Sequence, residues 1–161
     1  MHKFNRRYYR NIFELLKDLG LVVHNPPILV KLLLSSEISH AFRERLMLVV
    51  TAANRCRYCA RFHRRVATTC GLTKEDVDLF LSGVVDHCPE TEYVALGYAQ
   101  NWAENNGVPE PDILSLLLDQ YGEQIAMQIN VILRLIRIGN LLGNSFDFIL
   151  FRLSAGRLGN K

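Results

Sequence analysis

The chain lacks an uninterrupted apolar run long enough to cross a membrane, which needs about 20 apolar residues. The most apolar short run, residues 28–34, contains Lys31. The N-terminus has no apolar segment followed by a small-residue cleavage site, as a secretory signal would have. These absences predict a cytoplasmic protein with no membrane-spanning helix. A longer apolar stretch at 125–150 is interrupted by Arg134, Arg137, Asn140, Asn144 and Asp147.

The chain has no large excess of either charge, since 19 Lys and Arg residues against 16 Asp and Glu residues give a formal net charge of only +3. Basic residues cluster at Arg6-Arg7 and between Arg55 and Arg65. No DNA-binding motif or aromatic RNA-reading motif accompanies them, so we expect no nucleic-acid partner. Cysteine is also scarce, and 4 cysteines in a cytosolic-looking chain of this length do not resemble a disulfide scaffold. A Cys-x-x-Cys pair in this setting is more typical of redox or metal chemistry.

Strand patterning is missing as well, because no convincing run alternates between polar and apolar residues. Hydrophobic residues instead recur every three or four positions, as at Leu114, Leu117, Leu118 and Tyr121, which predicts helices. A length of 161 residues with 49% hydrophobic content suits one globular domain. We therefore predict a single all-α domain over 1–161. Its core covers about 39–147, and a helical extension precedes it at 1–35.

Capping and breaking residues divide the chain into predicted helices. Gly20 is expected to end the first helix, and Asn54 is a candidate N-cap for the helix that carries the two thiols. Thr73 and Asp76 approximate a capping box. The predicted helices cover 8–19, 26–34, 39–53, 54–71, 73–83, 89–105, 109–121, 123–139 and 145–153.

Cys56 and Cys59 specify a chemistry, because two thiols at this spacing can close a disulfide between themselves. On a helical wheel they lie within roughly 60° of His63. An imidazole one turn away can accept or return a proton. The thiols and the imidazole are therefore expected to face inward or toward a partly covered pocket. The opposite side of the wheel, expected to be solvated, carries Arg57, Arg61, Arg64 and Arg65.

The nucleophile is left open by these residues alone. Cys56 lies in the first turn of the predicted helix, where unpaired N–H groups and the helix dipole favour an anion. Cys59 gains less from the dipole, but His63 at i+4 is its direct neighbour. The two arguments favour different thiols.

Glu44 lies twelve residues before Cys56 and takes part only under one geometric condition. In a straight helix its carboxylate would sit about 18 Å from Cys56. A break at Asn54 that folds two helices antiparallel would bring Glu44 to His63, fixing the imidazole tautomer and raising its basicity. Taken alone, Glu44 is more simply an exposed helix residue between two arginines.

Other interpretations of the thiols are a haem attachment site, a zinc site and an inert buried pair. Ala60 follows the second cysteine where c-type haem attachment requires His, which excludes haem. Zinc could use Cys56, Cys59, His63 and Cys70, but Cys70 lies about 16 Å along an unbroken helix from Cys59. Free cysteines also pack well in cores, so an inert pair stays possible.

The pattern of Glu44, Cys56, Cys59 and His63, E-x11-C-x2-C-x3-H, resembles the active-site signature of AhpD-like alkylhydroperoxidases in the carboxymuconolactone decarboxylase superfamily. The flanks at 52–54, 67–77 and 91–99 are also similar, and the resemblance covers about 39–147. Some members carry His between the cysteines, where this chain has Tyr58. Tyr58 can form hydrogen bonds but does not shuttle protons near neutral pH.

The resemblance implies an all-helical fold, with a helical hairpin carrying the thiol pair, in homotrimers or hexamers. It implies reduction of small hydroperoxides, without cofactor or metal, and re-reduction by a dithiol or a redox partner protein. By analogy Cys59 becomes the sulfenic acid, Cys56 supplies a proton and closes the disulfide, and Glu44 and His63 form a proton relay. The alternative hypothesis is a non-catalytic oligomeric module for redox sensing or thiol-disulfide exchange. Cys70 and Cys88 are most simply structural.

Overall fold

The computed structural model describes residues 3–24, 26–27 and 37–159. Every regular element in these ranges is helical, and they contain no strand, which confirms the all-α prediction for the described part of the chain. Most of the helix predicted at 26–34 lies outside the described residues. The elements are α1 (Ile12–Val23), α3 (His40–Asn54), α4 (Arg57–Thr69), α5 (Lys74–Ser82), the short 3-10 helix η1 (Glu90–Glu92), α6 (Tyr93–Glu104) and α7 (Pro111–Leu153).

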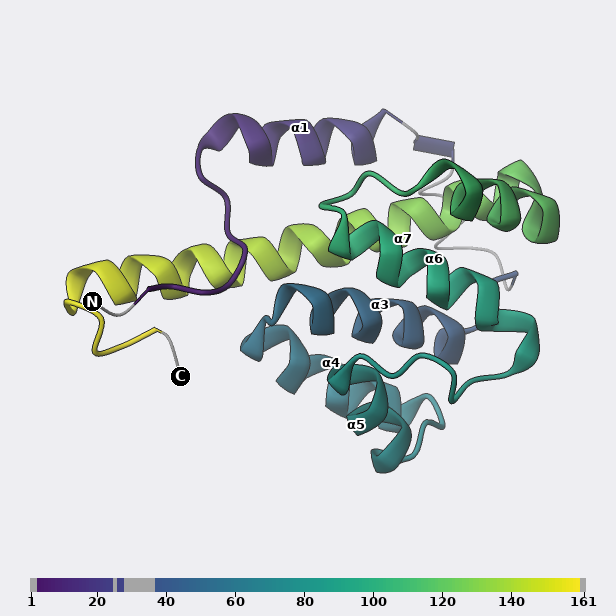
Figure 1. Ribbon diagram of the computed structural model, residues 1–161, viewed down its shortest axis with the longest axis horizontal. Helices are drawn as coiled ribbons and strands as arrows, with labels where there is room; N and C mark the ends of the chain where they lie inside the picture. Colours follow the sequence, from purple (N-terminus) through teal and green to yellow (C-terminus); the bar gives the residue numbers. More distant parts are fainter. Residues whose placement is uncertain (1–2, 25, 28–36, 160–161) are drawn as a thin grey trace.

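Helix α3 lies at the centre and packs against α4, α5, α6 and α7 (Figure 1). Its apolar side chains Leu46, Leu48 and Val50 are completely buried. The neighbouring α6 adds Trp102, which is also completely buried. Because α3 is covered on several sides, some of its polar side chains are also removed from water. This position takes Glu44 into the interior.

Helix α7 runs along the whole molecule (Figure 1). Gly122 breaks its helical conformation at φ 70° and ψ 166°, close to the predicted helix boundary. The predicted interruption between 139 and 145 is wrong, because the helix continues to Leu153. Asn140 and Asn144 are completely buried there, and they bind other helices instead of ending this one.

Helix α1 begins and ends later than predicted. Asn11 is its N-cap, and the Asn11 side chain accepts a hydrogen bond from the backbone N–H of Glu14 at 3.0 Å. Gly20 was expected to end the helix, but it lies within the helix, which continues to Val23. Glycine weakens a helix without terminating it unless the backbone adopts a positive φ.

The boundary between α3 and α4 differs from the prediction by two residues. Asn54 is the last residue of α3, not the N-cap of the next helix. Arg55 adopts the left-handed conformation at φ 55°, which reverses the chain, and Cys56 is the N-cap of α4. The chain break expected at Asn54 is therefore present, one residue later.

Helix α7 is long and apolar enough to cross a membrane by length and composition, with a mean hydropathy of 1.4 over its most apolar window. However, 56% of that window is buried inside the protein, as in the core helix of a globular fold. The described part of the chain thus gives no clear sign of a membrane protein.

Candidate active site

The two thiols lie together at the start of α4. The sulfur atoms of Cys56 and Cys59 are 2.8 Å apart, and both cysteines are free thiols. As the N-cap residue, Cys56 also accepts a hydrogen bond from the backbone N–H of Cys59 at 3.4 Å. The reversal at Arg55 produces this arrangement, because it places Cys56 just before the first helical turn. The pair can close a disulfide with little movement of the chain.

A cavity of about 400 Å³ opens onto one of these thiols. Cys59 and His63 both line it, as predicted from their positions on the helical wheel, whereas Cys56 does not. Cys56 is only 1% exposed. A small ligand entering the cavity therefore meets Cys59 first. The other lining residues are mostly apolar: Met47, Tyr58, Phe62, Leu135, Ile136 and Gly139.

Glu44 and His63 meet across the contact between α3 and α4. The Nδ1 atom of His63 donates a hydrogen bond of 2.8 Å to Oε2 of Glu44, and both residues are buried. The interpretation of Glu44 as an exposed helix residue is wrong. Its neighbour Arg45 is bound by Glu92 through two hydrogen bonds of 2.6 Å, so Arg45 does not compete for the Glu44 carboxylate. With Nδ1 engaged, Nε2 of His63 is the nitrogen left to exchange protons.

The two thiols differ in acidity. The hydrogen bond from the Cys56 S–H to Cys59 lowers the pKa of the Cys59 thiol to about 7. Burial opposes this shift, and a hydrogen bond from Asn140 assists it. The same contact with Cys59, together with burial, raises the pKa of Cys56 well above its ordinary value. The thiolate therefore forms more easily at Cys59 than at Cys56, despite the position of Cys56 at the helix N-terminus.

Helix α7 contributes three site residues that the sequence interpretation missed. Asn140 hydrogen-bonds to Thr51 on α3 and reaches Cys59. Gly143 leaves room for Cys56, because a Cβ atom on it would lie 3.0 Å from the Cys56 sulfur. Asp147 is completely buried beneath the start of α4. A signal was present, because Asn140, Gly143 and Asp147 are spaced to share one face of a helix.

Asp147 anchors the two residues that lie between the cysteines, Arg57 and Tyr58. Its carboxylate accepts hydrogen bonds from the Tyr58 hydroxyl at 2.7 Å, from Arg57 at 2.6 Å and from Arg6 at 2.8 Å. Burial opposes ionisation of this carboxyl group, but the three hydrogen bonds together lower the pKa of Asp147. Tyr58 thus holds the first turn of α4 onto α7, and Arg6 ties the N-terminal segment to the same point.

The remaining cysteines lie away from this group. Cys70 is the C-cap of α4, and Cys88 packs, partly buried, against the hydrophobic core. Within the described ranges, no three His, Cys, Asp or Glu side chains are grouped closely enough to hold a metal ion. The arginines of α4 are exposed, as predicted from the wheel.

Residues 29–101 match the family model described as the Carboxymuconolactone decarboxylase family. The matched segment includes all four residues of the E-x11-C-x2-C-x3-H pattern. This match confirms the resemblance at the level of that family, which contains AhpD-like proteins. Neither a curated protein nor a solved structure matches the chain.

Proposed function

We propose that this protein is a thiol-dependent hydroperoxide reductase of AhpD-like type. The match of residues 29–101 to the carboxymuconolactone decarboxylase family is the starting point for this proposal. The observation that carries the proposal is that Cys59 and His63 line the same cavity. The sulfur of Cys56 lies 2.8 Å from that of Cys59, and Oε2 of Glu44 lies 2.8 Å from Nδ1 of His63. The arrangement places a nucleophile, a resolving thiol and a proton carrier within one small site. No cofactor is needed for the steps below.

The first step is attack of the Cys59 thiolate on the terminal oxygen of the hydroperoxide. The O–O bond breaks, Cys59 becomes a sulfenic acid, and the leaving alkoxide takes the proton of Cys56 and departs as an alcohol. The proton lost from Cys59 is held by His63, whose imidazolium form Glu44 stabilises. The raised pKa of Cys56 keeps its thiol protonated until that moment.

The second step closes the disulfide. The Cys56 thiolate attacks the Cys59 sulfur, and the departing hydroxide takes the proton from His63 and leaves as water. One dithiol and one hydroperoxide thus give one disulfide, one alcohol and one water. A dithiol reductant, either a small molecule or a redox partner protein, returns the two electrons by thiol-disulfide exchange.

We further propose that the chain works as a cytoplasmic homo-oligomer, a trimer or a hexamer. Exposed apolar residues on α4 and α7 support this: Phe62, which lines the thiol cavity, is 62% exposed, Phe146 on α7 55% and Leu142 on α7 45%. A surface of this kind is typical of a protein-protein contact. The same observation favours a second candidate function, a non-catalytic redox-sensing or thiol-exchange module whose disulfide alters a partner surface.

A steady-state assay against several hydroperoxides, with lipoyl and thioredoxin-type electron donors, tests the proposal. We expect repeated turnover, loss of turnover in Cys59→Ser, and a trapped sulfenic acid at Cys59 in Cys56→Ser that a dimedone-type probe detects. Cys70→Ser, which changes a thiol outside the site, should keep its activity. A sensor would oxidise once and stop. Absence of both peroxide consumption and a Cys56–Cys59 disulfide would refute the peroxidase assignment.

A further inference from the structure

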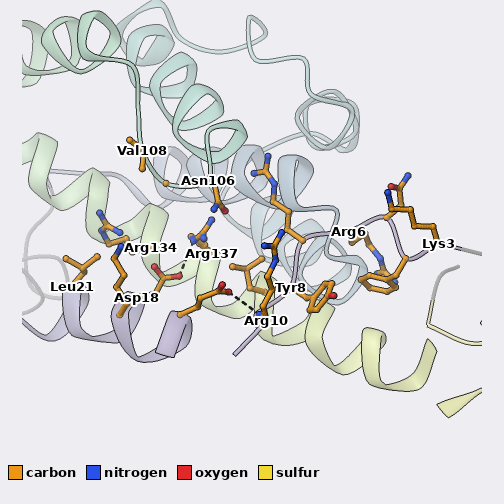
Figure 2. Close-up of a pocket in the computed structure, with 17 residues that line it drawn as sticks. Lys3, Arg6, Tyr8, Arg10, Asp18, Leu21, Asn106, Val108, Arg134 and Arg137 are labelled. Carbon is orange, nitrogen blue, oxygen red and sulfur yellow. Dashed lines mark hydrogen bonds and ion pairs between the residues drawn. The ribbon is translucent and has the colours of Figure 1, made fainter. Parts of the chain in front are cut away.

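A second and larger cavity, of about 770 Å³, lies between the N-terminal segment, α1, the loop after α6 and α7 (Figure 2). It shares no lining residue with the thiol cavity. Its volume falls within the range of small-molecule sites, roughly 300–1,000 Å³. The peroxidase steps do not use it.

The wall of this cavity is strongly basic. Seven of its lining residues are Lys or Arg, and only Glu14 and Asp18 are acidic. Both carboxylates already have partners within the protein. Glu14 accepts a hydrogen bond from the backbone N–H of Arg10 at 3.0 Å, and Asp18 accepts one from the Tyr9 hydroxyl at 2.8 Å. The cavity therefore has positive charge that its own acidic residues do not balance.

Arg137 is a buried cation with one donor left unsatisfied by the described residues. It is buried, with a side-chain exposure of 10%, and its Nε donates to Oδ2 of Asp18 at 3.0 Å. Its Nη1 atom is also buried, yet finds no hydrogen-bond acceptor among the described residues. A buried charged donor without an acceptor is costly, and in native proteins it calls for an explanation. A bound acceptor is the simplest one.

Arg134 lies one turn before Arg137 on α7 and lines the same cavity. Its guanidinium sits 5.6 Å from the centre of the Trp102 ring, and Arg137 sits 6.0 Å from the same ring. Within the part of the chain that the structure describes, Arg134 has no hydrogen bond or ion pair to a carboxylate. Two guanidinium groups are thus held over one aromatic ring, and both retain unused donors.

The electrostatics agree with this geometry. Burial lowers the pKa of Arg134; the charges of Asp18 and Tyr98 oppose this shift, and repulsion from Arg137 adds to it. Burial and the charge of Arg137 likewise lower the pKa of Arg7, which lines the same cavity, while the charge of Glu104 opposes the shift. An anion among these groups would relieve both the repulsion and the cost of burial.

We propose that this cavity binds a small multivalent oxyanion, a phosphate ester or a polycarboxylate, through Arg134 and Arg137. A planar guanidinium matches the oxygen spacing of either group and binds it with two parallel hydrogen bonds. The excess of positive charge selects for more than one negative charge. Leu21 and Val108, which also line the cavity, offer apolar surface for the uncharged part of the ligand.

The test is calorimetric titration of the reduced protein at low ionic strength, with pyrophosphate and citrate as the probes. At least one probe should bind saturably, with about one site per chain. Arg134→Met should weaken binding about tenfold or more, since each lost guanidinium removes charge-assisted hydrogen bonds. Arg137→Met should do the same. Because Arg134 makes no hydrogen bond or ion pair to a carboxylate among the described residues, its variant keeps the test valid if Arg137→Met fails to fold.

Arg152→Met is the matched control, since it removes an exposed arginine from the same helix outside the cavity. It should bind the probes within about twofold of the unchanged protein, a difference small in free energy. Failure of both probes to bind at millimolar concentration would overturn the proposal, as would equal binding by Arg134→Met. Binding to phosphatidylglycerol vesicles without binding of either probe would also overturn it, since the ligand would then be a lipid surface. None of these outcomes depends on peroxidase activity.

Discussion

Gly143 lies where α7 packs tightly against the Cys56 thiol, so Gly143→Ala tests the packing of the site directly. A Cβ atom at this position would lie 3.0 Å from the Cys56 sulfur and 3.3 Å from Cδ2 of Tyr58. Ordinary contacts between carbon atoms begin at about 3.5 Å. One or both neighbours must therefore move, and Tyr58 is held in place by its hydrogen bond to Asp147.

Two opposing effects determine the magnitude. Replacing glycine by alanine inside a helix usually stabilises the protein by about 0.8–1.0 kcal/mol. Overpacking a tight contact costs about 1–3 kcal/mol. Gly97→Ala in α6 isolates the first effect, because a Cβ atom at Gly97 would meet nothing within 4 Å. The free energies of unfolding of the two variants should therefore differ by about 1–3 kcal/mol, with Gly143→Ala the less stable.

The assay is urea unfolding of the reduced proteins, followed by far-UV circular dichroism. A second measurement is the alkylation rate of Cys59, which Gly143→Ala should change because displacement of the Cys56 sulfur weakens the hydrogen bond that acidifies Cys59. Gly97→Ala should leave that rate unchanged. If both variants gain stability equally and Cys59 reacts as before, the close approach of α7 to the thiols is not a constraint.

Three further predictions concern the same site. The rate of Cys59 alkylation by iodoacetamide should rise with pH through a midpoint near 7. Cys56→Ala should move that midpoint upward, because it removes the hydrogen bond that lowers the pKa of Cys59. An unmoved midpoint would refute the role of this hydrogen bond. Glu44→Gln should slow steady-state peroxide turnover by about tenfold or more, since the His63 imidazolium loses its counter-charge, and an unchanged rate would remove Glu44 from the relay. Tyr58→Phe should lower the free energy of unfolding by about 1–2 kcal/mol through loss of the bond to Asp147. It should leave the alkylation midpoint of Cys59 in place, and a shift would mean that Tyr58 acts on the thiol itself.

The predicted fold and site were most accurate where local patterns carry the information. The capping box at Thr73 and Asp76 is present, because it depends on residues three apart. The inward orientation of Cys59 and His63 followed from helical geometry alone. Predictions failed where a residue's role depends on its neighbours in space.

The polar residues that interrupt the apolar stretch at 125–150 have roles that depend on their neighbours in space. Read along the chain, Asn140, Asn144 and Asp147 break an apolar run. In the fold they are buried polar contacts, to Thr51, to the backbone of Asn54 and to the start of α4. A buried polar group requires a partner, and the partner comes from another helix, so the sequence of one segment cannot reveal it.

Some properties of the Cys56–Cys59 pair were therefore determined by the sequence alone, and others were decided only by the fold. Spacing determined that the two thiols can pair and that His63 shares their face, because a helix repeats every 3.6 residues. Only the tertiary structure decided which thiol is the more acidic and which one meets the cavity. It also decided that Glu44 reaches His63. These properties depend on the local chain reversal at Arg55 and on the packing of α4 against α3 and α7, which no pattern within one helix specifies.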